Sequence, residues 1–281
     1  MTKLKLNPID VLNLRFASRI YDKEFISAFV NQLDLSSADD ICEKAKSICT
    51  WYEEIVINHA YFLKNFLDDH LSNSDDQQLL IFLSAGKSPL SLEITKKNSD
   101  KIFRVIELDN DGMYEKKEIY DRYYPGLSPK IKCLNADIKT GSLLSTINLV
   151  LEEYSEELPC VVILEKVIHY LKPEELQHIV SSFKSSGRKN TFVVEYILPE
   201  ELMSPECRSM VEKLFELVNS HCGMTEINHY SESQVAGMFS SFGGELLLHQ
   251  NMMEIELQRM GSNKYFQKHE DGWLECAAWK I

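Results

Sequence analysis

Two carboxylates and a turn of small residues are the groups in this chain whose types and spacing could bind a nucleoside. Residues 79–83 form a short apolar run, as in a strand buried on both faces, and residues 84–86 then remove side-chain bulk where a ligand could come close. Glu107 and Asp109 end a second apolar run, 102–106, and a carboxylate there can accept hydrogen bonds from both hydroxyls of a ribose. This order predicts an α/β site for a nucleoside-containing cofactor.

The residues after the turn predict the start of a helix. Ser88 offers a hydroxyl as N-cap and Pro89 suits the first helical position, so free backbone N–H groups would face the turn. The dinucleotide-binding fingerprint has three glycines, whereas this turn has only Gly86. An ordinary strand-to-helix turn therefore explains the same residues, and the rest of the chain must decide.

The elements around this turn alternate between strand-like and helical segments. The strand candidates are residues 79–84, 102–108, 130–134, 160–165, 190–196, 244–256 and 272–280. Helical stretches separate most of the first five, which predicts βαβ crossovers and a parallel sheet. The last two are joined by a loop with no room for a crossover helix, so we expect an antiparallel pair at the sheet edge. The predicted fold is α/β and Rossmann-like, with a seven-stranded, mostly parallel sheet.

A helical region precedes this sheet. The apolar spacing is helical from residue 7 to about residue 71, and it ends in a long amphipathic helix over residues 51–71. The polar segment 72–78 is the best candidate for a boundary. We therefore expect a helical unit over residues 1–75 and a sheet domain over residues 76–281.

Composition and charge narrow the function. With 44% hydrophobic and 26% charged residues, the 281-residue chain is typical of a globular protein, and its net charge of −13 argues against a nucleic-acid partner. No apolar run is long enough to span a bilayer and the N-terminus lacks a signal-peptide pattern, so we expect no membrane partner. The seven cysteines include no CxxC pair, which favours free thiols in a cytoplasmic protein and no metal site.

Two more acidic positions follow predicted strands, where open α/β sheets bind their ligands. Asp137 and Ile138 come after the third strand, where a carboxylate could accept a hydrogen bond from an adenine amine. An Asp that caps a helix starting near Ser142 explains the same position. Glu165 ends the fourth strand and could bind an ammonium or ribose group, or it could pair with a Lys or Arg. His169, four residues later, fits a structural histidine.

The fifth strand candidate also ends in polar side chains. Glu195 and Tyr196 could contact a substrate there, or they could form a solvated strand end. The chain has no nucleophile elbow, no metal-ligand spacing of His and Cys, and no P-loop. Hydrolase and phosphoryl-transfer functions are therefore disfavoured.

Taken together, the strand-end motifs resemble those of class I S-adenosylmethionine-dependent methyltransferases, most closely the leucine carboxyl methyltransferase-like branch. In chain order the motifs read Ser84-Ala85-Gly86, Glu107-Leu108-Asp109, Asp137-Ile138, and Glu165 followed by Tyr170-Leu171. The resemblance covers roughly residues 51–281. It implies the Rossmann-like fold with its antiparallel C-terminal pair, and a helical N-terminus that closes over the site as a lid.

The resemblance also implies a role for each motif. Ser84, Ala85 and Gly86 would approach the methionine part of S-adenosylmethionine, Asp109 would hold the ribose, Asp137 and Ile138 the adenine, and Glu165 the methionyl or ribose region. The chain departs from the family at Ser84, which replaces a glycine, and in residues 57–61, which have no Arg to bind the cofactor carboxylate. In that segment His59 is the candidate for binding the cofactor. The Pro-Leu-Ser-Leu sequence after Ser88 resembles the corresponding sequence of nicotianamine synthase. That enzyme uses the aminopropyl group of the same cofactor.

Three functions follow from these residues. The leading hypothesis is methyl transfer to an oxygen of a small molecule, a carboxylate or a hydroxyl. The alternative is cyclisation of the cofactor to azetidine-2-carboxylate with release of methylthioadenosine, in which Tyr170, Glu195 and Tyr196 orient or deprotonate its amine. The third is a non-catalytic binding subunit, because of Ser84 and the missing Arg. Aromatic residues of the lid, among them Tyr21, could lie against the sulfonium or pack as core. A small-molecule substrate is the partner that we expect.

Overall fold

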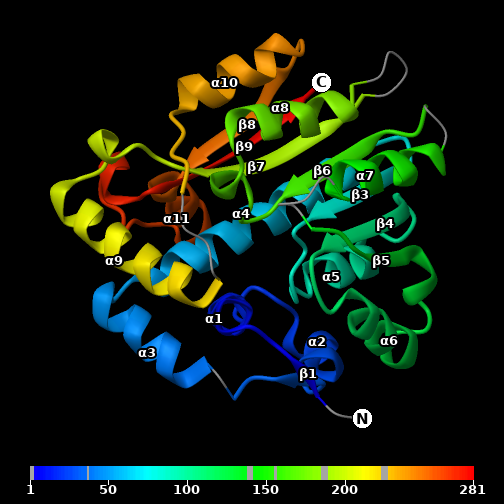
Figure 1. Cartoon of the computed structure of the whole chain (residues 1–281), viewed down its shortest axis with the longest axis horizontal. Coiled ribbons are helices and arrows are strands. Elements are labelled where there is room, and N and C mark those ends of the chain that lie inside the picture. The colour runs from blue at the N-terminus through cyan, green and yellow to red at the C-terminus, as the bar shows by residue number, and fades with distance from the viewer. Residues whose placement is uncertain (1–2, 37, 138–141, 155–156, 185–188, 223–226) are drawn as a thin grey trace.

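The centre of the molecule is a sheet whose strand order reverses at β3. The computed structural model describes residues 3–36, 38–137, 142–154, 157–184, 189–222 and 227–281, and within them the main sheet has seven strands in the order β5-β4-β3-β6-β7-β9-β8 (Figure 1). The strands are β3 (Gln78–Leu83), β4 (Ile102–Asp109), β5 (Ile131–Asn135), β6 (Cys160–Leu164), β7 (Thr191–Ile197), β8 (Glu245–Asn251) and β9 (Leu274–Lys280). The first five are parallel, and β9 runs antiparallel to β7 and β8. The predicted Rossmann-like sheet is confirmed.

One predicted strand is shorter than expected. β8 ends at Asn251 rather than at residue 256, and helix α11 (Met252–Met260) begins there. The Asn251 side chain accepts a hydrogen bond from the Glu254 amide at 3.0 Å, and the Glu254 carboxylate accepts one from the Asn251 amide at 3.0 Å. The expectation that only a loop joins the last two strands is wrong, because this reciprocal cap starts a helix within the apolar run.

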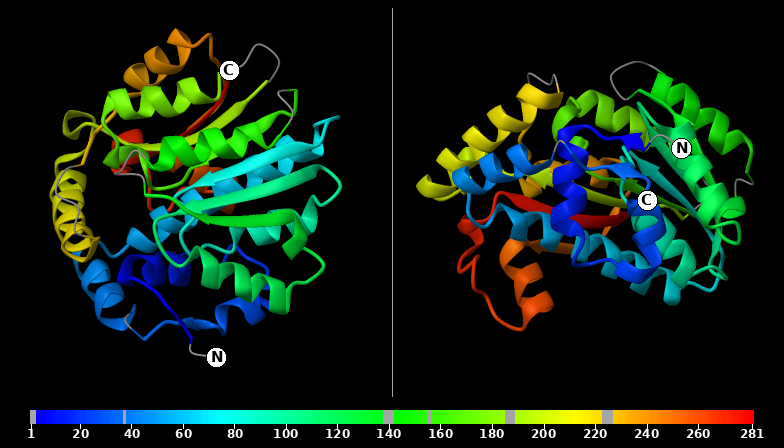
Figure 2. Two further views of the ribbon diagram at one scale, coloured as in Figure 1. Left: turned by 45° about the vertical axis from the view of Figure 1, so that its right-hand side comes forward. Right: turned by 90° about the horizontal axis from the view of Figure 1, so that it is seen from below.

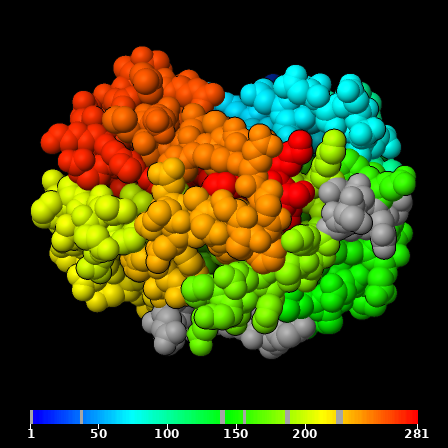
Figure 3. Space-filling view, turned by 90° about the horizontal axis from the view of Figure 1, so that it is seen from above, coloured from blue at the N-terminus to red at the C-terminus, as the bar shows by residue number. Residues whose placement is uncertain are grey.

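Helices cover both faces of the sheet. The part of the chain from β3 onward contains α5 (Leu90–Lys97), α6 (Met113–Tyr123), α7 (Ser142–Glu152), α8 (Pro173–Ser182), α9 (Pro205–Cys222) and α10 (Glu232–Ser241), with short 3₁₀ helices η1 (Ser128–Lys130), η2 (Ile168–Tyr170), η3 (Glu200–Leu202) and η4 (His269–Asp271). Of these, α9 packs against the N-terminal helices. Right-handed crossovers place α5 and α6 on one face and α7, which packs against α8, on the other. Figure 3 shows α8 and α10 on a side of the molecule where hardly any N-terminal residue is visible. Among the described residues, no helix combines the length and apolar character that a membrane crossing requires.

The N-terminal helices gather on one side of the molecule (Figure 2). They are α1 (Pro8–Ala17), α2 (Lys23–Val30), α3 (Ala38–Ile48) and α4 (Tyr52–Ser72), of which α4 is the long helix that the sequence predicts. Two short parallel strands, β1 (Leu4–Lys5) and β2 (Leu33–Asp34), interrupt the expected helical region. Because α4 packs against α5 and α11, the N-terminal helices share a core with the sheet. The division at residue 75 stays a prediction.

The reversal of strand order brings the carboxyl ends of β3 and β6 side by side. Leu83 pairs with Leu164 there, and each strand is followed by a non-glycine residue with positive φ, Ser84 at 62° and Lys166 at 55°. The connections leave this point in opposite directions, which opens a crevice beyond the strand ends. Strained backbone is concentrated at functional sites, so this edge of the sheet is where a site is expected.

Candidate functional site

The turn after β3 is held by hydrogen bonds to the end of β4. The Ala85 amide donates to the Leu108 carbonyl at 3.0 Å, and the Gly86 amide donates to Oδ2 of Asp109 at 2.7 Å. Gly86 has a φ of 52°, a conformation that glycine adopts without steric cost. The turn and Asp109 therefore form one unit at the sheet edge.

Helix α5 begins one residue later than predicted. Pro89 is the N-cap rather than the first helical residue, and the Ser88 hydroxyl accepts a hydrogen bond from the Leu90 amide at 3.2 Å. The hydroxyl of Tyr21 lies 3.3 Å from the same Ser88 oxygen. Ser88 thus caps α5 from one position earlier and joins the turn to the N-terminal helices.

Glu107 supports the turn through Lys116 and is not among the residues that line the adjacent cavity. Its carboxylate is 1% exposed, pairs with Lys116 at 2.9 Å and accepts a hydrogen bond from the Ser91 hydroxyl. Lys116 also donates to the Gly86 carbonyl at 3.0 Å. Removing either partner would leave an uncompensated buried charge, so this pair stabilises the turn and is not a ligand site.

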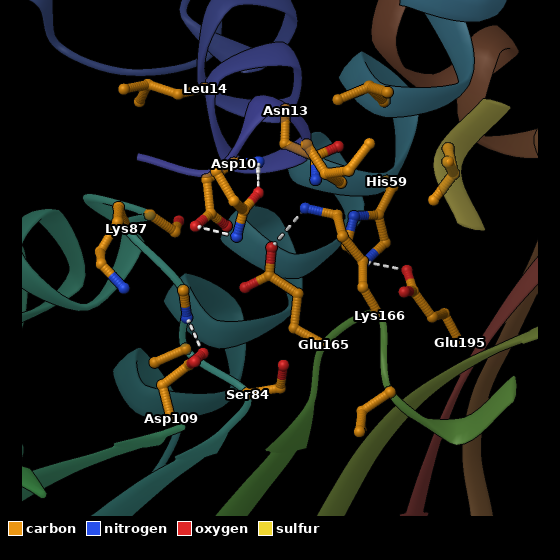
Figure 4. Close-up of a pocket in the computed structure, with 18 of the residues that line it drawn as sticks. Asp10, Asn13, Leu14, His59, Ser84, Lys87, Asp109, Glu165, Lys166 and Glu195 are labelled. Carbon is orange, nitrogen blue, oxygen red and sulfur yellow. Dashed lines mark hydrogen bonds and ion pairs between the residues drawn. The ribbon is translucent and has the colours of Figure 1, made fainter. Parts of the chain in front are cut away.

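A cavity of about 470 Å³ lies between the strand ends and helices α1 and α4. Its volume is in the range of small-molecule and cofactor sites. Ten of the residues that the sequence analysis proposes for the site line it: Tyr21, His59, Ser84, Ala85, Gly86, Asp109, Asp137, Glu165, Tyr170 and Glu195. Figure 4 shows several of them around one space. The structure therefore brings together residues from β3, β4, β6 and β7.

The segment after β5 is described only in part. The Asp137 amide donates to the Ser142 hydroxyl at 3.1 Å, and this hydroxyl donates back to the Asp137 carbonyl at 3.1 Å. The backbone of Asp137 thus forms hydrogen bonds with the first residue of α7, and Asp137 is one of the residues that line the cavity. Ile138, the other residue predicted to contact adenine, lies outside the described residues.

Tyr196 does not line the cavity, although the sequence analysis places it beside Glu195 as a candidate catalytic residue. Neighbouring residues of a strand point to opposite faces of the sheet, so Tyr196 faces away from Glu195. Its hydroxyl donates to Oε2 of Glu275 at 2.8 Å and lies 2.9 Å from Nε2 of His249. These contacts argue against a catalytic role and give Tyr196 a structural one.

A carboxylate and a lysine follow β6 at the floor of the cavity. Lys166 donates to Oε1 of Glu165 at 2.8 Å, whereas Oε2 of Glu165 is buried without a hydrogen-bond partner in the part of the chain that the structure describes. Burial alone would lower the pKa of Lys166, but the charges of Glu165 and Glu195 outweigh it and raise this pKa. Lys166 is therefore a stable cation, and Glu165 has one oxygen free for a ligand.

His59 from α4 and Glu195 from β7 are in direct contact inside the same cavity. The pair joins Nε2 to Oε2, and the two side chains are 3% and 2% exposed. Burial by itself would raise the pKa of Glu195, but its interactions with His59 and Lys166 lower this pKa. Burial lowers the pKa of the neighbouring His169 to about 4. At neutral pH Glu195 is thus ionised and His169 is uncharged.

Several polar residues that line the cavity are missing from the sequence predictions, among them Asn7, Asp10, Lys87 and Lys166. Asn7 and Pro8 do signal a helix start, and Asp10 lies in the first turn of that helix. No local pattern predicts that the first turn of α1 lies against residue 86, which is far away in the chain. Lys166 is adjacent to Glu165, so its pairing with a neighbouring strand-end acid is the one contact that the sequence could have suggested.

Two solved structures resemble the whole chain. A protein from Thermobifida fusca, provisionally named a methyltransferase, matches with a TM-score of 0.66 at 12% identity, over 98% of this chain and 95% of that one. A DUF574 family protein from Streptomyces avermitilis matches with a TM-score of 0.60 at 12% identity, over 97% and 96% of the two chains. These likenesses show the fold. No protein-family model and no curated protein matches the sequence.

The residues around the cavity fit a cofactor that carries a ribose and positive charge. Glu165 offers an unpartnered carboxylate oxygen, and burying such an atom is costly unless a ligand donates to it. Asp109 accepts one backbone hydrogen bond on each oxygen, from Gly86 at 2.7 Å and Asn110 at 2.8 Å, and each oxygen retains a further lone pair. The turn itself carries no side chain larger than that of Ser84, so a ligand can approach its backbone closely.

Proposed function

We propose that this protein binds S-adenosylmethionine and transfers its methyl group to an oxygen of a small molecule. The observation that carries the proposal is that the turn 84–86, Asp109 and Glu165 face one cavity where the strand order reverses. Open α/β sheets bind nucleotide-like ligands at such a point. The fold shared with the Thermobifida protein, and the name of that protein, support the same proposal.

The proposed placement of the cofactor follows the strand order β5-β4-β3-β6. The adenine lies near Asp137 after β5, and the ribose hydroxyls donate to Asp109 after β4. The amino-acid part then extends toward the turn after β3 and toward Glu165 after β6. Lys166, a cation at this edge, binds the cofactor carboxylate, for which residues 57–61 offer no Arg. This order uses one residue from each successive strand end.

For methyl transfer, the protein mainly has to align the acceptor oxygen with the methyl group and exclude water. A lone pair of the acceptor oxygen forms the new bond to the methyl carbon. The bond from that carbon to sulfur breaks, and its electron pair stays on sulfur, which gives S-adenosylhomocysteine. Tyr21 lies at the lid side of the cavity, where its ring can attract the sulfonium. A carboxylate acceptor needs no base, whereas a hydroxyl acceptor must lose a proton.

The buried pair of His59 and Glu195 is the proposed acceptor of that proton. Nε2 of His59 contacts Glu195, so Nδ1 is the ring nitrogen left for an acceptor hydroxyl. An ionised carboxylate behind an imidazole orients the ring and stabilises the imidazolium that forms. The pair lies at the β7 end of the cavity, away from the proposed adenosine site after β4 and β5.

Cyclisation of the cofactor is the second candidate, and the same buried pair favours it. His59 and Glu195 share the cavity with Tyr170, so the amine of the cofactor itself could meet a base there. In that reaction the amine loses a proton to His59 and attacks the γ-carbon. The carbon–sulfur bond breaks, and methylthioadenosine leaves with the electron pair.

One assay separates the candidate functions. The purified protein is incubated with S-adenosylmethionine alone, and in parallel with a panel of small hydroxy and carboxylic acids, and the nucleoside product is identified by mass spectrometry. S-Adenosylhomocysteine that forms only with an acid from the panel supports methyl transfer. Methylthioadenosine without any added acid supports cyclisation and contradicts methyl transfer. Cofactor binding by calorimetry with neither product supports a non-catalytic binding subunit.

A further inference from the structure

We infer that Asp10, on the N-terminal helix α1, binds the α-ammonium group in the amino-acid part of the cofactor. The inference rests on the proposed function, because it requires S-adenosylmethionine in the cavity. It makes α1 a specificity element that distinguishes ligands with an amino-acid part from those without one. Three features of Asp10 support this assignment: the position of its carboxylate, the orientation of that carboxylate and the lack of a direct cationic partner for its charge in the described ranges of the chain.

Asp10 lies directly against the turn after β3, in the wall of the cavity. Its Oδ1 atom lies 3.1 Å from the position that a Cβ of residue 86 would occupy, so only the bare backbone of Gly86 opposes it. Figure 4 shows Asp10 on the α1 side of the space that Asp109 and Glu165 border from the sheet side. A ligand in this cavity that follows the strand ends past β3 therefore passes beside this carboxylate.

The carboxylate is held in this orientation by the N-cap of its own helix. The Asn7 side chain accepts a hydrogen bond from the Asp10 amide at 2.7 Å and donates one to Oδ2 of Asp10 at 2.8 Å. Oδ2 thus already accepts one hydrogen bond, and Oδ1 is the oxygen nearer to Gly86. A preoriented acceptor of this kind loses little side-chain entropy when a donor binds.

The charge of Asp10 has no direct cationic partner among the described residues. The lysines around it donate elsewhere: Lys87 to the Asp111 carbonyl at 2.7 Å, Lys116 to Glu107 at 2.9 Å and Lys166 to Glu165 at 2.8 Å. Burial raises the pKa of Asp10 to about 6, although the charge of Lys87 opposes this. A cationic donor from a ligand would supply what this carboxylate lacks.

The ammonium is the cofactor group that fits. In the proposed placement the adenine and ribose occupy the β5 and β4 ends, so the amino-acid part lies at the β3 end, beside Asp10. The sulfonium carries positive charge but has no hydrogen to donate, whereas the ammonium donates up to three hydrogen bonds. A charge-assisted hydrogen bond to Oδ1 is therefore available only to a ligand that retains this group.

Two ligands test the inference by calorimetry. S-Adenosylhomocysteine has the ammonium, and methylthioadenosine shares the adenosine and thioether but lacks the amino-acid part. For Asp10→Asn we expect the affinity for S-adenosylhomocysteine to fall by about tenfold or more, and the affinity for methylthioadenosine to stay within about twofold. Asp39→Asn, an exposed carboxylate on α3 that does not line the cavity, is the matched control. Retained binding of methylthioadenosine also shows that the variant is folded.

Each other outcome overturns the inference. Unchanged binding of S-adenosylhomocysteine by Asp10→Asn removes Asp10 as a ligand. An equal loss for both ligands assigns Asp10 a purely structural role in α1. A wild-type protein that binds neither compound contradicts the proposed function itself, and the inference with it. If the wild type binds both compounds, either of the first two results overturns the inference and leaves the proposed function standing.

Discussion

The amide of Gly86 donates a 2.7 Å hydrogen bond to Oδ2 of Asp109, so the turn after β3 is joined directly to the end of β4. The same carboxylate accepts a hydrogen bond from the Asn110 amide at 2.8 Å through Oδ1. Asp109 therefore shapes the turn as well as facing the cavity. A substitution of Asp109 therefore changes both the stability of the turn and the binding of a ligand in the cavity. These two effects can be measured separately.

For Asp109→Ala we expect affinity for S-adenosylmethionine to fall by about tenfold or more, because the proposed ribose acceptor is lost. The free energy of unfolding should fall by about 1–3 kcal/mol, because the Gly86 amide loses its partner, yet the protein should stay folded. Calorimetry measures the affinity and urea titration the stability. The control is Asp75→Ala, an exposed carboxylate outside the cavity. Unchanged affinity in the Asp109 variant would remove this residue from the site.

Gly86→Ala should both strain the turn and displace Asp10. A Cβ at a φ of 52° is unfavourable by about 1–2 kcal/mol, and this one would press against Oδ1 of Asp10. We expect a loss of stability of that size, together with weaker binding of S-adenosylhomocysteine. Gly126→Ala is the matched control, because a Cβ there meets no atom within 4 Å. If both variants bind and unfold alike, the close approach of α1 to the turn is refuted.

His169 should make the protein less stable in acid. Its pKa is lowered from 6.5 to about 4 by burial, so below pH 6.5 the unfolded chain binds a proton that the folded protein does not. This contribution to stability is present above pH 6.5 and is lost as the pH falls toward 4, by up to about 3 kcal/mol. Urea unfolding of wild type and His169→Leu at pH 7.5, 6 and 4.5 measures it.

The variant cannot bind that proton, so its stability should fall less steeply with pH than that of wild type. His178→Leu, an exposed histidine on α8, is the control and should follow the wild-type profile. Parallel profiles for wild type and His169→Leu would mean that His169 is not held uncharged in the folded protein.

Tyr196→Phe should separate stability from function. The hydroxyl donates to Glu275 and lies beside His249, outside the cavity, so its loss should lower the free energy of unfolding by about 1–3 kcal/mol. Affinity for S-adenosylmethionine and product formation should stay at the wild-type level. Tyr170→Phe, which alters a residue of the cavity wall, is the comparison and should change product formation. Impaired turnover in the Tyr196 variant at full affinity would restore its catalytic role.

Local sequence patterns are enough to predict the sheet and most of the strand-end residues. The runs that became β3 and β6 are apolar throughout because both faces of a parallel strand are buried, and the residues after them must lie at its carboxyl edge. That rule by itself brings Asp109, Glu165 and Glu195 to one side of the molecule. The exception is the end of β8, where the cap formed by Asn251 and Glu254 outweighs the apolar run.

The tertiary structure decides which of these strand-end residues line the same cavity and which contacts fix their side chains. Strand alternation and packing turn Tyr196 and Glu107 out of the cavity, while α4 brings His59 to Glu195 from a distant part of the chain. The approach of Asp10 to Gly86 depends on how α1 packs against α3, α4 and α9. The sequence alone determined the strands and the acids at their ends, because these depend on local periodicity. The contacts of Glu107 with Lys116, of Glu195 with His59 and of Asp10 with Gly86 were decided only by folding, because they join residues that no local pattern links.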